Sequence, residues 1–362
     1  MKVAFVSTAI APYTAPAREI INQDSRIDCT HFFAREIEPG RQWKIKSHPH
    51  NFVISKGLTL ILGNKFLYLP WQLPVLLKQY KPNAIVTEQL GALLFFTLLY
   101  AIPARVPVLL RWEGTIHTEA RFSGIRTKIR KLLATKLTGF LSYSKQSDQY
   151  LESLDLKQPK RRICYSVSDD FFYPPANNFN RNSASFLYVG QLIHRKGVEQ
   201  LISAFLTLLE KAPQAELWIV GDGIDKHLLQ NMIPRQIQDH IIFYGFQTAK
   251  QIANLMRSAG NFVCPTLEDH GPVVQIEAAK TGLPIIGSIF SGNADIIIQP
   301  GTNGYIVDPL DQQALTNAMY NLLMHPAREN LHAASLKLAQ PHSVHGEADS
   351  TVTAILNLVK KL

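Results

Sequence analysis

Cysteine is scarce in this sequence and shows no paired spacing. Among 362 residues the cysteines are Cys29, Cys164 and Cys264, which lie far apart along the chain. Disulfide frameworks and cysteine-based zinc sites both need closely spaced cysteines, so we expect neither. A reducing, cytoplasmic environment suits this composition best.

Long apolar runs are missing as well. A membrane-spanning helix needs about 20 apolar residues, whereas the most apolar stretch, Leu90–Ile102, has 13 residues and is followed by Pro103. We expect this stretch to form a buried helix. The first 16 residues contain one lysine, a short apolar run and two prolines, which is typical of a buried strand and its loop rather than of a signal peptide.

Positive charge is concentrated in the first half of the chain. Residues 1–172 hold 24 Lys and Arg against 13 Asp and Glu, whereas the remaining residues hold 13 against 15. Such asymmetry points to one face that meets an anionic partner, either nucleic acid or a membrane surface. Residues 121–136 place six cations around apolar residues at helical spacing, which suits an anionic membrane interface. The alternative is a helix packed on its own sheet with a solvated basic rim. Because the cationic stretch has no interleaved aromatic platforms, we expect no nucleic-acid partner.

Short β-rich runs alternate with helix-length segments in both halves, as in parallel sheets with crossover helices. Residues 170–182, rich in proline and asparagine, form the linker between the halves. We therefore predict an α/β fold with two doubly wound, Rossmann-like domains, residues 1–172 and 183–342, which face each other across a cleft. Residues 343–362 are predicted to form a helix that packs on either domain. If it packs on the first domain, the chain crosses back to that domain at its C-terminal end.

In such open sheets, ligands bind beyond the carboxyl ends of the strands, so the residues that follow each strand are the candidates for function. The strands expected in the first half are Lys2–Ser7, Asp28–Phe33, Ala84–Thr87, Val108–Arg111 and Gly139–Ser142. Those expected in the second half are Ser185–Gln191, Glu216–Val220, His240–Phe246, Asn261–Thr266 and Pro284–Ser288.

A basic, glycine-flanked segment follows the first strand of the second half. It runs from Gly190 through Gln191, Arg195 and Lys196 to Gly197. The two cations can neutralise a diphosphate, and a glycine allows its close approach to the backbone. A solvated basic turn that caps a helix is the equally simple alternative.

A second candidate is the segment from Pro265 to Pro272, which contains Asp269, His270 and Gly271 and leads into a predicted helix. Pro272 suits the first helical turn. The N–H groups of Val273 and Val274 would then form an anion site at the positive end of the helix dipole.

Two acidic residues accompany this helix start. Asp269 and Glu277 are eight residues apart, so one can reach a sugar and the other a ribose, because carboxylates accept hydrogen bonds from vicinal hydroxyls. The neighbours Ile276 and Ala278 indicate that Glu277 is not an ordinary surface residue.

Weaker candidates follow other strands of the second half. Backbone groups of Tyr244, Gly245 and Phe246 lie where they can contact a base, and the glycine-bearing turns at 291–295 and 301–309 can equally be tight connections.

The segment from Leu187 to Pro309 resembles the nucleotide-sugar-binding domain of family 4 (group 1) retaining glycosyltransferases of GT-B fold. The matching pieces are YVGQLIHRKGVEQLISAF, LWIVGDG, IIFYGF, FVCPTLEDHGPVVQIEAAKTGLPIIGS and SGNADIIIQPGTNGYIVDP. The first half resembles the family only through its first strand, residues 38–43 and residues 142–151.

The resemblance implies that Glu277 is the second acidic residue of the family's E-x7-E motif and binds the donor ribose. It implies that Asp269 contacts the transferred sugar and that Lys196 binds the diphosphate. The family often has arginine where Gln191 stands, so Arg195 is expected to carry part of that role. The first acidic position here is Asp269, one methylene shorter than glutamate.

The acceptor side is predicted to lie in the first half. Family members often carry a functional histidine just after the strand at 107–111. Glu113 stands there, and His117 follows four residues later. Either can orient the acceptor hydroxyl, and we favour Glu113 as the catalytic group; the alternative for Glu113 is an ion pair with Arg111 or residue 121. The loop that contains Tyr13 lacks the family's glycine pair, and Tyr13 is a further acceptor candidate.

We therefore expect an enzyme that moves a hexosyl unit from a UDP- or GDP-sugar to a sugar or lipid-linked acceptor with retention, in polysaccharide or glycolipid synthesis. No Asp-x-Asp pattern is present to hold a metal ion on the diphosphate, so metal independence is expected, as is the absence of any cofactor beyond the nucleotide sugar. A peripheral position at the inner face of the membrane would suit a lipid-linked acceptor. A catalytically idle sugar-nucleotide-binding protein and a nucleotide-sugar epimerase are the alternatives.

Overall fold

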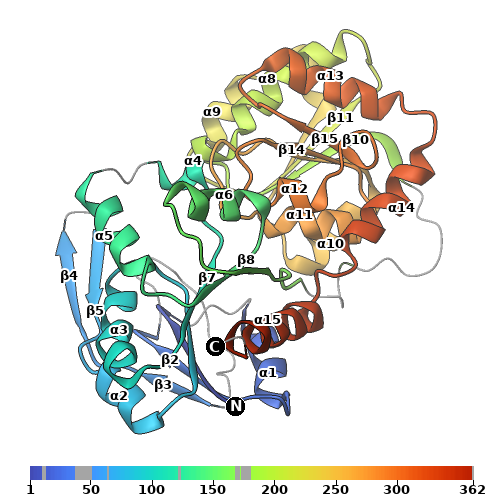
Figure 1. Ribbon diagram of the computed structural model, residues 1–362. Coiled ribbons are helices and arrows are strands. Elements are labelled where there is room, and N and C mark those ends of the chain that lie inside the picture. Colours follow the sequence, from blue (N-terminus) through green and yellow to red (C-terminus); the bar gives the residue numbers. More distant parts are fainter. Residues whose placement is uncertain are drawn as a thin grey trace. The chain divides into compact units, whose positions relative to one another are not determined.

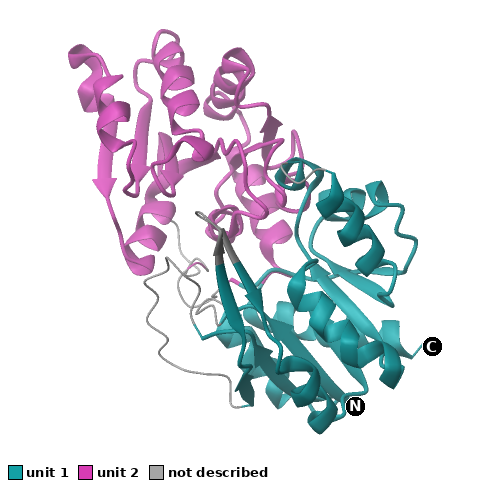
Figure 2. Ribbon diagram, turned by 90° about the vertical axis from the view of Figure 1, so that its left-hand side faces the viewer, with its two compact units in different colours: residues 1–166, 343–362 teal, residues 167–342 magenta. Residues whose placement is uncertain are grey.

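The chain folds into two compact units. The computed structural model describes residues 1–9, 14–36, 51–62, 65–120, 124–167, 172 and 181–360. Residues 1–166 and 343–362 form the first unit, and residues 167–342 form the second (Figure 2). Each unit is built on one parallel sheet that is covered by helices.

The first unit contains a seven-stranded sheet in the order β3-β2-β1-β6-β7-β8-β9 (Figure 1). All neighbouring strands in it are parallel. The strands are β1 (Lys2–Ser7), β2 (Asp28–Phe33), β3 (Phe52–Ile54), β6 (Ala84–Thr87), β7 (Val108–Trp112), β8 (Gly139–Ser142) and β9 (Lys160–Arg162). Strands β4 (Leu58–Leu62) and β5 (Lys65–Leu69) pair only with each other, as an antiparallel hairpin.

Helices cover both faces of this sheet. They are α1 (Ala15–Gln23), α2 (Leu73–Tyr80), α3 (Ala92–Ala104), α4 (Ile116–Glu119), α5 (Ile125–Ala134), α6 (Lys145–Ser153) and α15 (Val344–Val359). The chain passes from β1 to β2 in one direction and from β3 through β6, β7 and β8 in the other. Right-handed crossovers therefore place α1 on one face and α2, α3 and α5 on the opposite face. The C-terminal helix α15 packs on α1, so of the two arrangements expected, the chain adopts the one that crosses back to the first unit.

The second unit contains a six-stranded parallel sheet in the order β12-β11-β10-β13-β14-β15. Its strands are β10 (Asn182–Val189), β11 (Glu216–Val220), β12 (Ile241–Gly245), β13 (Ala259–Cys264), β14 (Ile285–Ser288) and β15 (Gly304–Val307). Its helices are α8 (Val198–Leu209), α9 (Lys226–Asn231), α10 (Ala249–Ser258), α11 (Val273–Lys280), α12 (Ala294–Ile297), α13 (Gln312–Leu323) and α14 (Arg328–Ala339), with 3-10 turns η2 (His194–Lys196) and η3 (Arg235–His240).

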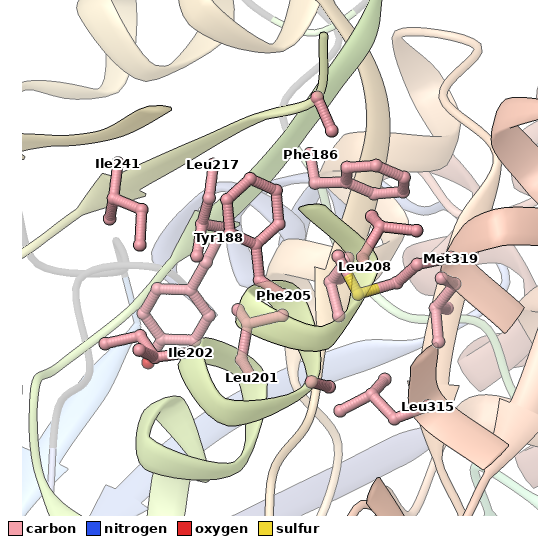
Figure 3. Packing of buried hydrophobic residues seen from close by; sticks show 14 of the residues in the cluster. Phe186, Tyr188, Leu201, Ile202, Phe205, Leu208, Leu217, Ile241, Leu315 and Met319 are labelled. Carbon is pink, nitrogen blue, oxygen red and sulfur yellow. The ribbon is translucent and has the colours of Figure 1, made fainter. Parts of the chain in front are cut away.

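A buried apolar core holds helices α8 and α13 on this second sheet. Phe186 and Tyr188 of β10 face Phe205 of α8, and Met319 of α13 closes the same cluster (Figure 3). These side chains are buried, and burial of one such side chain stabilises a fold by about 1.5–3 kcal/mol. The core therefore fixes the ends of the strands, and the candidate loops of this unit begin at those ends.

Two parallel-sheet, Rossmann-like units confirm the predicted fold class. One expectation about an element is wrong: the apolar stretch Leu90–Ile102 is not a buried helix. The helix there, α3, has a buried face and an exposed face, and the exposed face carries Phe95, Leu99 and Ile102. No helix among the described residues is long and apolar enough to cross a membrane.

Candidate functional site

The loop after β10 lies directly against the loop after β13. Gly197 has φ 69°, and a Cβ atom there would overlap the carbonyl oxygen of Pro265. Only glycine adopts this conformation without a clash at that distance. The short turn η2, with Lys196 at its end, is thereby held beside the segment that contains Asp269.

The two loops are joined by charged and backbone contacts. The Lys196 ammonium forms an ion pair with the Asp269 carboxylate, and the Arg195 guanidinium lies 3.8 Å from the same carboxylate oxygen. The backbone carbonyl of Arg195 accepts hydrogen bonds from Leu267 N–H at 2.8 Å and from the Thr266 hydroxyl at 3.0 Å. The loops therefore hold two cations and one carboxylate together at the carboxyl ends of β10 and β13.

Helix α11 begins at this cluster. Pro272 is the N-cap residue of α11. The sequence had suggested that it lies one position later, in the first helical turn. The backbone N–H groups of Val273 and Val274 make no hydrogen bond within the described part of the chain. Gly271 N–H donates to Asp269 Oδ1 at 3.3 Å. Two free N–H groups at the positive end of a helix dipole form a site that favours an anion.

Glu277 lies one turn along α11 on the same face as Val273, because residues four apart share a helix face. Its side chain is half-buried, and its carboxylate makes no hydrogen bond or ion pair with any residue that the structure describes. Desolvation by burial raises the pKa of Glu277 from 4.5 to about 7. A carboxylate that is desolvated and unpaired is available to accept hydrogen bonds from a ligand.

The remaining donor-side candidates lie at neighbouring strand ends. Gly190, after β10, has its carbonyl oxygen so close to Gly221 of the loop after β11 that a Cβ atom on Gly221 would overlap it. Gln191 is exposed, and Phe246 after β12 is 80% exposed. His270 is half-buried beside Asp269. The candidates of the second unit thus follow strands β10, β12 and β13, whose carboxyl ends lie along one edge of the sheet.

Residues 169–337 match the sequence model of the family described as glycosyl transferases group 1. The second unit is a group 1 glycosyltransferase domain. An uncharacterized glycosyltransferase of Haemophilus influenzae is 22% identical over 281 residues, which are 76% of each chain. A GDP-mannose-dependent mannosyltransferase of Mycolicibacterium smegmatis, which acts on phosphatidylinositol monomannoside, is 30% identical over 42% of this chain and 41% of its own length. The chain thus spans about two fifths of that relative.

The fold of the whole chain is that of the GT-B glycosyltransferases. The structure of Anabaena HepE in complex with UDP has a TM-score of 0.77 and 15% identity, and the match covers 99% of this chain and 100% of that one. At this identity the similarity shows the fold alone. The predicted family and GT-B fold are both confirmed.

The acceptor candidates lie outside the group 1 domain, in the first unit. Glu113 and His117 are exposed, and His117 is on the short helix α4 just after β7. Arg111, suggested as an alternative partner of Glu113, forms ion pairs with Glu347 and, at 3.7 Å, with Glu88. Tyr13 and residues 38–43 and 121–123 lie outside the described residues. The roles proposed for Glu113, His117 and Tyr13 stay predictions.

A polar cluster in the first unit is not among the sites predicted from the sequence. Arg18 of α1 forms an ion pair with Glu88 at 3.1 Å and donates to the Ser7 hydroxyl at 3.1 Å. Burial raises the pKa of Glu88, but Arg18 and Arg111 outweigh this effect and hold that pKa below its ordinary value. Ser7 ends β1 and Glu88 follows β6, so this cluster lies at the carboxyl edge of the first sheet. The sequence feature that could have indicated this cluster is Glu88, a single acidic residue directly after the predicted strand Ala84–Thr87.

Among the residues that the structure describes, no three His, Cys, Asp or Glu side chains are grouped so that they could hold a metal ion.

Proposed function

We propose that the protein is a retaining, metal-independent glycosyltransferase that moves a hexosyl unit from a UDP- or GDP-sugar to a sugar or lipid-linked acceptor. The observation that carries the proposal is the position of Glu277, a desolvated and unpaired carboxylate one turn from two free N–H groups. The vicinal hydroxyls of a ribose suit the carboxylate, and a diphosphate suits the N–H groups and Lys196.

The ion pair between Lys196 and Asp269 suggests how donor binding proceeds. A diphosphate carries more charge than one carboxylate, so it competes with Asp269 for Lys196. Once displaced, Asp269 is free to accept hydrogen bonds from hydroxyls of the transferred sugar. Lys196, Arg195 and the amino end of α11 then stabilise the negative charge that develops as the diphosphate leaves.

Retention requires that the acceptor hydroxyl attacks from the face that the diphosphate leaves. The bond from the anomeric carbon to the phosphate oxygen breaks, and the bond to the acceptor oxygen forms on the same side. The acceptor proton passes to the departing diphosphate. Glu113 is proposed to orient that hydroxyl, with His117 and Tyr13 as further acceptor contacts in the first unit. An acceptor from polysaccharide or glycolipid synthesis, reached in the cytoplasm, suits this arrangement.

The names of related proteins leave the donor base open between uracil and guanine. The mycolicibacterial relative is named as GDP-mannose-dependent, and the structural neighbour was solved with UDP. The exposed ring of Phe246 after β12 offers an apolar face to either base.

The proposal is tested with purified protein and a panel of UDP-, GDP- and ADP-sugars. Thermal shift identifies the donor, since a ligand at a hundredfold its dissociation constant stabilises the protein by about 2.7 kcal/mol. Release of nucleoside diphosphate is then followed with chelator present, and NMR gives the anomeric configuration of the product. Binding without any release would leave a catalytically idle protein, and conversion of the donor to its epimer would identify an epimerase. An inverted product would refute retention.

A further inference from the structure

Helix α3 exposes an apolar face that a solvated helix does not normally carry. Its inner side packs Leu94 and Leu98 into the core. On its outer side Phe95, Leu99 and Ile102 are between 47% and 56% exposed. The helix holds no charged residue over its 13 positions. Surface helices of globular proteins place charged and polar residues on the outer side, so this face is suited to a partner.

Helix α5 presents a second face of the same kind. Ile125, Ile129 and Leu132 follow the spacing of one helix face and are between 51% and 77% exposed. Strands β6 and β7 are neighbours, so the crossover helices α3 and α5 that follow them cover the same face of the sheet (Figure 1). Their inner residues belong to one core cluster. The two apolar faces therefore point outward from one helical layer.

The charge on these helices is predominantly positive. Helices α2, α3 and α5 contain no Asp or Glu, whereas exposed cations are present at Lys78, Arg126, Lys128 and Lys131. Lys131 lies 3.8 Å from the carboxylate of Asp155, and because both side chains are exposed this pair is weak. Apolar side chains surrounded by cations complement a surface that is apolar in depth and anionic at its boundary.

We propose that the outward sides of α3 and α5, called the docking face below, bind the surface of an anionic lipid bilayer. Phe95, Leu99 and Ile129 would enter the boundary of the acyl chains, and Lys128 and Lys131 would meet lipid phosphates. A second copy of the chain fits less well, because a symmetric contact would bring like charges of α5 together. Nucleic acid fits less well because the face of α3 offers no hydrogen-bonding groups.

The docking face is separate from the donor loops and goes beyond the proposed function. It involves the first unit alone and needs no nucleotide sugar. Failure of membrane binding would leave donor binding untouched, and failure of donor binding would leave the docking face untouched. A glycosyltransferase with this surface would meet lipid-linked acceptors where they are presented.

Vesicle flotation with the full chain tests the proposal. Vesicles of one part phosphatidylglycerol to two parts phosphatidylcholine should carry the protein upward at low salt, and vesicles of pure phosphatidylcholine should carry far less. Each cation near an anionic surface strengthens binding about fivefold. The double variant Lys128→Gln/Lys131→Gln should therefore partition about 30-fold more weakly. Leu99→Gln should weaken binding as well. Raised salt should release the unaltered protein from the anionic vesicles.

Matched variants in the second unit serve as controls. Lys211→Gln/Lys250→Gln removes the same charge from exposed positions, and Leu310→Gln replaces an exposed leucine. Both should float like the unaltered protein. The proposal is overturned if the unaltered protein stays at the bottom with anionic vesicles, or if the control variants lose as much binding. It is also overturned if sedimentation shows a dimer that Leu99→Gln dissociates, since the face would then join two copies. Circular dichroism checks that each variant folds.

Discussion

The Glu277 carboxylate is expected to lower the stability of the unliganded protein, although it is proposed to bind the donor ribose. Its carboxylate is desolvated and unpaired within the described chain, which raises its pKa from 4.5 to about 7. A group whose pKa is higher in the folded state stabilises the fold when protonated, and this contribution is lost as the pH rises through the folded value. Replacing Glu277 by Gln keeps the shape of the side chain and removes the charge.

The size of the effect follows from the two pKa values. The interval between 4.5 and about 7 corresponds to about 3 kcal/mol, at 1.36 kcal/mol for each tenfold change. At about pH 8 the carboxylate is mostly ionised, so Glu277→Gln should raise the free energy of unfolding by about 3 kcal/mol. At about pH 4 the carboxyl is protonated in both states, and the variant should gain close to nothing.

Urea unfolding at a series of pH values measures this difference. Glu210→Gln, at the exposed end of α8, is the control, and its stability should follow that of the unaltered protein. Glu277→Gln should also lose the donor-induced thermal shift, since an amide oxygen replaces a charged acceptor. The claim that this carboxylate is desolvated is refuted if Glu277→Gln is no more stable than the unaltered protein at about pH 8. It is also refuted if the variant gains as much stability at about pH 4.

Further outcomes are expected for the donor loops, for the ion pair of Glu347 and for the metal dependence of transfer. Lys196→Met should lower the rate of donor cleavage about 100-fold or more, measured as diphosphate release, because a charge that meets the leaving group is lost. Gly197→Ala should destabilise the protein by about 1–3 kcal/mol in urea, because its φ of 69° is unfavourable for alanine and Pro265 blocks the Cβ atom. An unchanged midpoint would contradict the described loop contact. Glu347→Ala should lower the free energy of unfolding by about 3–5 kcal/mol, because Arg111 is left buried without its partner on α15. An excess of EDTA should leave the rate of transfer unchanged, and a rate restored only by added magnesium would contradict metal independence.

The strand positions could be predicted from the sequence because each buried strand is a short apolar run between turn residues. Strands Lys2–Ser7, Asp28–Phe33 and Glu216–Val220 have the bounds that the sequence suggested. The edge strands β3, β9 and β15 were not predicted, nor was the hairpin of β4 and β5, whose strands pair with each other and not with the seven-stranded sheet. Helix α3 was placed correctly, but an all-apolar sequence carries no periodicity that tells which face is exposed.

The donor loops were predictable because their residues are close in sequence and follow strands. Glu277 was expected to be partly buried from its neighbours Ile276 and Ala278, and the structure agrees. The ion pair of Lys196 with Asp269 could not be foreseen, because it depends on how the loops after β10 and β13 meet. The cluster around Glu88 joins residues from distant segments, which no local pattern connects.

A crystal structure with an intact nucleotide sugar tests the central claim most directly. Ribose hydroxyls are expected within hydrogen-bonding distance of the Glu277 carboxylate, with the diphosphate beside Lys196 and the N–H groups of Val273 and Val274. Asp269 should then have moved from Lys196 to the sugar. A nucleotide bound elsewhere, with Glu277 and Lys196 unchanged, would contradict the account.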